Sequence, residues 1–425
     1  MDPALSTLPQ ELWDSVLDYL CDDQDTLAAC CLTCQAWLGI ARILRWRTVS
    51  CPTSRLQRRL QTVLQPGKTI LNLAPLIVHL DIQPGSNDLD WFTALPNVQH
   101  LTLRMLDCIQ QRWINPPASR SRSILAGRLT SIRMLSLPAC RISPVSLAWL
   151  LTLTPNLSAL DLLKTQIMYD RDLNPDPSDS VSCRLEHLSW NLNDPLPIAL
   201  SSLCTSLRGI SFWGTVPTWA ARCGMIGGID EVSSVLRNAG TSLTTLALVL
   251  EHTPRFYSTI AMRELESRLD LSHNPHLTSL HIDIVVGSPM TRNWTDIPSS
   301  VLACIPQTLL RVRRVDIHLH LWPHEHLLQR PRQQEHLGHE ITHLLQANTD
   351  LVVTFHVRAG ERDAQIARRS IAKRLRVSCP WLAEETERLR FIHDLVVGRP
   401  PVWHWQSGWE KSDTVGSIPL FQVLA

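Results

Sequence analysis

Apolar residues near the N-terminus recur at helical spacing. They fall on one stripe of an amphipathic helix, with Gln10, Glu11, Asp14, Ser15 and Asp18 opposite. The stripe consists of Leu8, Leu12, Trp13, Val16, Leu17 and Leu20. Pro9 suits the first turn of such a helix, where its missing N–H has no intrahelical acceptor. The pattern therefore predicts a first helix that presents one apolar face.

A second stripe follows an acidic cluster at residues 22–25, which can supply a cap for the next helix. It comprises Leu27, Cys31, Cys34, Leu38 and Ala41, with Trp37 beside it. Two or three helices in about 45 residues cannot bury a useful core alone. The stripes must therefore pack on a partner or on the rest of the chain, and an ordinary N-terminal cap for the next domain is the alternative interpretation.

The spacing of these residues resembles the F-box family, particularly its fungal members. The match covers Leu8-Pro9-x-Glu11-Leu12, Val16-Leu17-x-x-Leu20, Leu27-Ala28-x-x-Cys31-Leu32-x-Cys34-x-x-Trp37 and Ala41-Arg42. Gln35 departs from it, because many members carry Arg or Lys after the cysteine. The resemblance implies a helix face that binds a Skp-type adaptor, and through that adaptor a cullin-based ubiquitin ligase.

The resemblance also implies which side chains of this sequence make the interface. Six residues would form the first contact segment: Leu8, Pro9, Leu12, Val16, Leu17 and Leu20. Four more would complete the fold or the interface: Leu27, Cys31, Cys34 and Trp37.

From about residue 74 an aliphatic residue is repeatedly followed by others three and five positions later. The copies begin at Ile77, Val98, Ile132, Leu157, Leu185, Leu207, Leu243, Leu277 and Val312, at intervals of 21 to 36 residues. Pro-Asn or Asn-Pro turn signals precede several copies. Four copies place Cys140, Thr165, Asn193 and Thr215 eight residues after the start. The pattern resembles a leucine-rich repeat, in which a short strand lines a curved array and such a side chain bonds the turn backbone.

The alternative is that this pattern arises easily in a leucine-rich chain. The favoured fold is of α+β or α/β repeat type, a small helical F-box joined to an irregular leucine-rich-repeat solenoid. The predicted division is an F-box at 6–48, a linker helix at 49–73, the solenoid at 74–360 and a helical, Trp-rich cap or tail at 361–425. Residues 287–300 are expected to form a loop.

Charge and composition refine this interpretation. The chain is 44% apolar with a net charge of +1, while residues 1–40 carry seven acids and no Lys or Arg. The average charge gives no general footprint for nucleic acid or membrane, and neither is expected as a partner. The twelve scattered cysteines, without a secretory signal, indicate reduced thiols and a cytoplasmic or nuclear location.

One motif points to a different class of protein. His339-Glu340-x-x-His343 matches the H-E-x-x-H pattern of zinc peptidases, with Glu361 as a conceivable third ligand. We interpret it instead as part of a histidine-rich repeat helix at residues 335–346. Residues 318–322 and 351–357 read as strands, the former with His318 and His320 on its polar face. No metal or other cofactor and no catalytic residue is predicted.

The predicted function is therefore that of a substrate-recruiting adaptor of a cullin-type ubiquitin ligase. In such an arrangement the F-box docks on the Skp-type adaptor, and the repeat array holds a target protein that the sequence does not identify. A repeat scaffold without a ubiquitin role remains the first alternative, and a zinc metallopeptidase the second.

Overall fold

A computed structural model describes most of the regular structure of the chain. The described residues are 9–21, 23–64, 73–83, 95–106, 129–168, 183–192, 194, 196, 200, 202–215, 231–252, 269–286, 296–305, 311–321, 334–359, 388–395 and 418–419. The chain divides into two compact units, Met1–Arg184 and Leu185–Ala425. Each combines helices with parallel strands, so the protein is of mixed α and β class with extensive parallel sheet.

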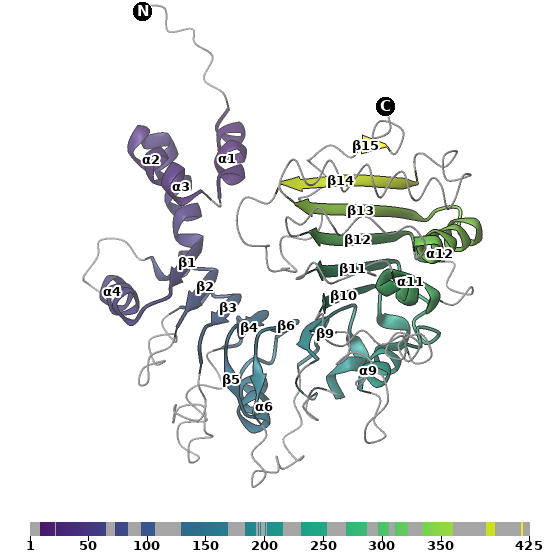
Figure 1. The fold of residues 1–425 in the computed structure, drawn as a ribbon. Coiled ribbons are helices and arrows are strands. Elements are labelled where there is room, and N and C mark those ends of the chain that lie inside the picture. The colour runs from purple at the N-terminus through teal and green to yellow at the C-terminus, as the bar shows by residue number, and fades with distance from the viewer. Residues whose placement is uncertain are drawn as a thin grey trace, which may run out of the picture. The chain divides into compact units, whose positions relative to one another are not determined.

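In the first unit, three helices come first along the chain and the strands of a parallel sheet follow (Figure 1). Its helices and first strand are α1 (Gln10–Tyr19), α2 (Gln24–Thr33), α3 (Gln35–Arg47), β1 (Thr48–Cys51) and α4 (Ser54–Leu64). The later elements are η1 (Ala74–Leu76), β2 (His79–Ile82), β3 (His100–Leu103), β4 (Met134–Ser136), β5 (Arg141–Ile142), α6 (Pro144–Leu153), β6 (Ala159–Leu162) and β7 (Gln166–Ile167). Strands β1, β2, β3, β4 and β6 lie side by side in that order, all parallel, and β5 pairs with β7.

The second unit stacks its strands in sequence order, with helices placed between them along the chain. Its strands are β8 (His187–Asn191), β9 (Gly209–Thr215), β10 (Thr245–His252), β11 (Ser279–Val286), β12 (Arg314–Leu321), β13 (Val352–Ala359), β14 (Leu389–Leu395) and β15 (Ile418–Pro419). Only the pairing of β14 with β15 is antiparallel among the described strand pairs of this unit. The helical segments are η3 (Ser202–Ser206), α9 (Glu231–Ala239), η4 (Gly240–Ser242), α11 (Asp296–Ala303) and α12 (Gln334–Ala347).

Equivalent apolar residues of successive strands lie in register. In the first unit one such column contains Leu80, Leu101, Leu135 and Leu160. In the second unit it contains Leu188, Ile210, Leu246, Leu280, Val315, Val353 and Leu389. Every member is at most 5% exposed. Because side chains alternate across a strand, the apolar columns face the core, and polar side chains such as Asp81, Ser136 and Asp161 face the opposite side.

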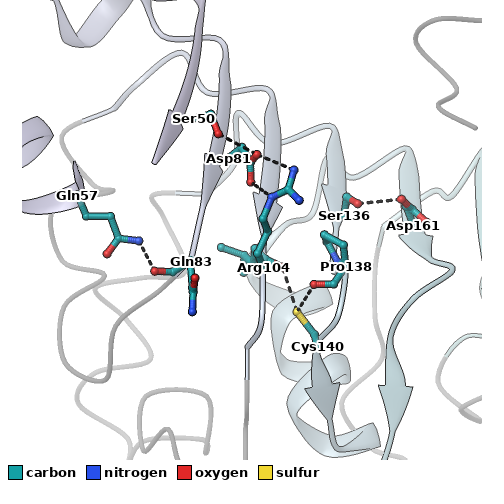
Figure 2. A network of polar contacts seen from close by, with 10 residues as sticks. Ser50, Gln57, Asp81, Gln83, Arg104, Ser136, Pro138, Cys140 and Asp161 are labelled. Atoms are coloured by element: carbon teal, nitrogen blue, oxygen red, sulfur yellow. Dashed lines mark hydrogen bonds and ion pairs between the residues drawn. The ribbon is translucent and has the colours of Figure 1, made fainter. Parts of the chain in front are cut away.

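Side chains in the turns after the strands bond the backbone of the preceding turn. The Cys140 thiol donates to the Leu103 carbonyl at 3.0 Å and accepts from the Leu106 N–H at 3.3 Å. The Thr165 hydroxyl donates to the Leu137 carbonyl at 2.6 Å. The predicted role is thus confirmed for Cys140 and Thr165; Asn193 and the Thr215 side chain lie outside the described part. Figure 2 shows Cys140 beside Pro138, next to the polar row formed by Asp81, Ser136 and Asp161.

A second set of polar residues lies three positions before a strand and reaches back in the same way. Asn97 donates to the Pro75 carbonyl and Asn156 to the Thr130 carbonyl, both at 2.7 Å. The hydroxyls of Ser206 and Ser242 bond the carbonyls of Leu185 and Leu207 at 2.7 and 2.9 Å. These contacts satisfy turn carbonyls that would otherwise need water, and they join each strand to the turn before it.

All nine predicted aliphatic patterns lie on strands, and each strand begins two residues after its pattern starts. The nine strands are β2, β3, β4, β6, β8, β9, β10, β11 and β12. The predicted strand at 351–357 is confirmed as β13, the helix at 335–346 as α12, and α4 lies within the predicted linker helix. The compact-unit boundary between residues 184 and 185 was not predicted.

Three expectations were wrong in detail. Residues 48–51 form the edge strand β1, whereas residues 49–51 were expected to be helical. Residues 296–300 form the start of helix α11 and not a loop. The helix is held in place by its buried residues Val301 and Leu302. The predicted helical tail contains strands β14 and β15, since the alternating segment 389–395 extends the parallel pairing of β13.

The turn contacts predict a stability difference between two threonines of the first unit. Thr165→Val leaves the buried Leu137 carbonyl without its hydroxyl donor, and we expect a loss of about 1–3 kcal/mol. The matched change Thr152→Val removes an exposed hydroxyl that bonds within its own helix, and it should alter stability by less than about 0.5 kcal/mol. Urea denaturation followed by circular dichroism measures both variants; equal effects would contradict a structural role for the Thr165 contact.

Candidate docking face of the N-terminal helices

Helices α1, α2 and α3 surround a small core of their own. The core contains Leu17, Leu27, Cys30, Ala41 and Leu44, all at most 8% exposed. Five partly buried residues pack around it: Leu20, Cys21, Cys31, Trp37 and Ile40. The rings of Trp13 and Trp37 join α1 to α3, with centroids 4.7 Å apart and planes at 52°. A core of this size holds the helices in place while leaving much of their surface free.

The ends of α1 and α2 follow from local chemistry. Asp23 caps α2, accepting hydrogen bonds from the Thr26 N–H at 2.9 Å and the Thr26 hydroxyl at 2.6 Å. The hydroxyl bond, followed by the backbone bond, lowers the pKa of the exposed Asp23 carboxyl. This confirms that the acidic cluster supplies a cap. Pro9 precedes the first turn of α1 as its N-cap residue, one position earlier than the sequence predicted.

The outer side of α1 carries large apolar side chains that the protein does not bury. Leu12 is 50% exposed, Val16 47% and Tyr19 90%. They occupy positions i, i+4 and i+7, so they form one continuous stripe along the helix. Leu32, near the end of α2, is 89% exposed. We call Leu12, Val16 and Tyr19 the docking face.

The structure divides the predicted adaptor-binding residues into three groups. Leu17 and Leu27 face the core and are at most 1% exposed; Leu20, Cys31 and Trp37 pack at its border. Pro9, Leu12, Val16 and Cys34 are exposed, and Leu8 lies outside the described residues. The predicted set therefore mixes residues that form the module with residues that are available to a partner.

Two exposed apolar residues, Tyr19 and Leu32, were absent from the predicted set. Tyr19 follows Leu12 by seven residues, and this spacing could have identified it as the end of the stripe. Leu32 precedes Thr33, the last residue of α2, and it belongs to neither apolar stripe. Only the arrangement of the three helices shows that its side chain is left in solvent.

The candidate zinc motif lies on the described helix α12. Leu337, Ile341 and Leu345 form the buried side of this helix, each at most 1% exposed. His339 and His343 are exposed, one turn apart, and Glu340 is half-buried. Glu361, His324 and His326 lie outside the described residues. Within the described part of the chain, no three His, Cys, Asp or Glu side chains form a group that could hold a metal ion.

A buried ionic cluster crosses three strands of the second unit. Asp316 on β12 is fully buried, and its Oδ2 atom lies 2.6 Å from Arg314 Nε and 3.0 Å from His281 Nδ1. His356 Nε2 lies 3.3 Å from Asp316 Oδ1, and the His356 ring stacks on His318 with centroids 4.0 Å apart. His318 was predicted on the polar side of its strand; that side is buried here.

The electrostatics of the cluster favour an ionised Asp316. Burial by itself raises the pKa of this carboxyl, but hydrogen bonds from His281 and His356 and the charge of Arg314 outweigh burial. The pKa of Asp316 therefore lies well below its ordinary value. An ionised carboxylate with three donors is a satisfied buried charge, so we assign the cluster to the stability of the sheet.

Comparison with known proteins identifies no family. Neither the protein-family models nor the curated proteins contain a match to this chain. Among the described helices, none has both the length and the apolar character of a bilayer-crossing segment.

The Asp316 cluster predicts acid sensitivity. Because its folded pKa is lowered, Asp316 stabilises the fold in full above its unfolded pKa of about 4, and the contribution is lost as pH falls toward the folded pKa. Asp316→Asn should destabilise the protein by roughly 3–5 kcal/mol at pH 7, because it breaks a buried ionic cluster. The difference in unfolding free energy between this variant and wild type should become smaller below about pH 4.

Urea denaturation at several pH values measures this difference. The matched control is Asp350→Asn, which replaces an exposed carboxyl and should change stability by less than about 0.5 kcal/mol. A gap between Asp316→Asn and wild type that stays constant from neutral to strongly acidic pH would refute the assignment.

Proposed function

We propose that this protein is a substrate-recruiting adaptor of a cullin-type ubiquitin ligase. Its N-terminal helices would be an F-box that docks on a Skp-type adaptor. The observation that carries the proposal is the docking face, an exposed apolar stripe on a helix whose other side is fixed to a small core. Such a stripe is the form in which an amphipathic helix enters a groove on another protein.

The charge of the module supports a role in docking. Residues 1–40 carry seven acids and no Lys or Arg, and the acids Glu11 and Asp18 on α1 are exposed near the stripe. An apolar centre with a charged, solvated rim is the usual anatomy of a protein interface. The energy would come from Leu12, Val16 and Tyr19, while the rim would influence orientation and rate of association.

For the remainder of the chain we propose a degenerate leucine-rich-repeat solenoid that holds the target protein. Support comes from the in-register apolar columns and from the turn contacts of Cys140 and Thr165, each reaching back to the preceding turn. In such an array each repeat contacts only its neighbours, and the stacked repeats form an extended surface. A broad surface suits a protein target better than a small molecule.

In this proposal the chain has no catalytic step of its own. It would bring the target close to the ligase, and the ligase would supply the transfer of ubiquitin. The gain in rate comes from holding two proteins together at high effective concentration. The cytoplasm or nucleus is the compartment that this role requires.

Co-purification with a Skp-type adaptor tests the docking face. Wild-type protein should retain the adaptor, and Leu12→Asp/Val16→Asp should weaken binding at least about 30-fold, because a charge in a buried hot spot loses more than 2 kcal/mol. Met105→Asp is the matched control, since Met105 is 62% exposed and lies outside the three helices. It should bind as wild type does.

Two outcomes would overturn the proposal. If the wild-type protein does not retain the adaptor, the F-box assignment fails and a repeat scaffold without a ubiquitin role is favoured. If the double variant binds as well as the control, the docking face is not the interface. Far-UV circular dichroism of each variant ensures that a loss of binding is not a loss of folding.

A further inference from the structure

The acidic start of the chain is followed by a region of opposite charge. Between residues 26 and 80 there is no Asp or Glu, and seven cations are present: Arg42, Arg45, Arg47, Arg55, Arg58, Arg59 and Lys68. The six arginines lie on two helices that flank strand β1, the C-terminal half of α3 and the N-terminal half of α4. The reversal of charge thus coincides with the passage from the docking helices to the sheet.

Most of these arginines are in solvent and without a counter-charge. Arg45, Arg55, Arg58 and Arg59 are exposed, and no described residue forms an ion pair with them. Arg47 lies 3.9 Å from Asp18, but both side chains are at least half exposed, so the pair contributes little. The positive charge of the region is therefore available to a partner.

The next acid along the chain does not neutralise the region. Both Asp81 oxygens are engaged by Arg104, at 2.7 and 2.8 Å, and one also accepts from the Ser50 hydroxyl at 3.1 Å (Figure 2). The hydrogen bond and charge of Asp81 raise the pKa of Arg104, against the effect of burial. The Asp81 carboxylate is therefore engaged by residues beside its own strand, Ser50 and Arg104.

Helix α4 is anchored by its opposite side. Leu60 is 5% exposed, and the buried Gln57 amide donates to the Gln83 carbonyl that follows β2 (Figure 2). Arg55, Arg58 and Arg59 are at positions i, i+3 and i+4, so they share the solvent side of one fixed helix. The three guanidinium groups therefore extend from backbone positions that are fixed relative to one another.

Folding alone does not favour the placement of charge on α4. A helix N-terminus carries a partial positive charge, so cations in the first turns are unfavourable by about 0.3–1 kcal/mol each. Neighbouring like charges at i, i+3 and i+4 add a smaller penalty. The first turn of α4 contains no acid and its last turn no base, so the helix lacks both stabilising placements of charge. The benefit of the α4 arginines is therefore expected in binding.

We propose that Arg55, Arg58 and Arg59 on α4, here called the basic surface, bind an acidic segment of another protein. Arginine suits this role because its planar guanidinium can hold a carboxylate through two parallel hydrogen bonds. The proposal concerns a surface separate from the docking face and does not depend on the F-box assignment.

Nucleic acid and membrane fit the basic surface less well. Residues 48–64 contain no aromatic side chain on which a base could stack. The apolar side of α4 is buried against the protein, so it is not free to enter a bilayer.

Fluorescence anisotropy with the full chain and a labelled poly-glutamate peptide tests the basic surface. Binding should weaken between about 50 and 200 mM salt, as expected for contacts between exposed charges. Arg55→Glu/Arg58→Glu/Arg59→Glu should weaken it at least about tenfold, because three attractive contacts become repulsive. Arg55→Gln/Arg58→Gln/Arg59→Gln, which adds no acid and relieves repulsion within α4, should show a smaller loss.

The matched control is Arg184→Glu/Arg208→Glu/Arg237→Glu, which makes the same charge change at three exposed arginines elsewhere. It should bind the peptide as wild type does, and so should Leu12→Asp/Val16→Asp. The proposal is overturned if wild type does not bind the peptide, or if the control loses as much affinity as the α4 variant. It is also overturned if an oligonucleotide of equal charge, or a second copy of this chain detected by sedimentation, occupies the surface in preference.

Discussion

The register of the parallel strands is the constraint on which the rest of the structure depends. Each strand places one apolar residue opposite the equivalent residue of the next, so that Leu80 lies beside Leu101 and Leu280 beside Val315. A shift by one residue would move every core side chain to the polar side. The turn residues oppose such a shift, because Cys140 and Thr165 bond particular carbonyls of the preceding turn.

The same register explains the polar side of the sheet. Residues 35 and 40 positions apart in the sequence become direct neighbours, and this brings His281 and His356 to the two sides of Asp316. In the first unit it likewise brings Asp161 within 2.8 Å of Ser136, and Arg104 onto Asp81. The polar contacts are therefore consequences of a spacing that the apolar columns determine.

This dependence also shows what the sequence could and could not predict. The nine strand segments and helix α12 were predictable because their apolar periodicity is local. The edge strand β1 and strand β14 were missed because each is recognised chiefly by pairing with a neighbour. The burial of His318 and the exposure of Leu32 depend on which elements pack together, and no local pattern reveals this. For the candidate site, the structure leaves Leu12 and Val16 of the predicted stripe exposed. Tyr19, one turn further along the helix, was not part of the predicted stripe.

The connections between strands differ in length far more than the strands differ in position. The contacts of Asn97 and Ser242 reach back 22 and 35 residues, yet both reach the backbone before the preceding strand. Residues added between two strands need not disturb either of them, since loop closure becomes only slowly less favourable with length. Insertions and deletions can therefore accumulate in these connections during evolution while the paired strands keep their places. A chain built in this way can diverge widely in length and sequence from its relatives and still fold by the same rule.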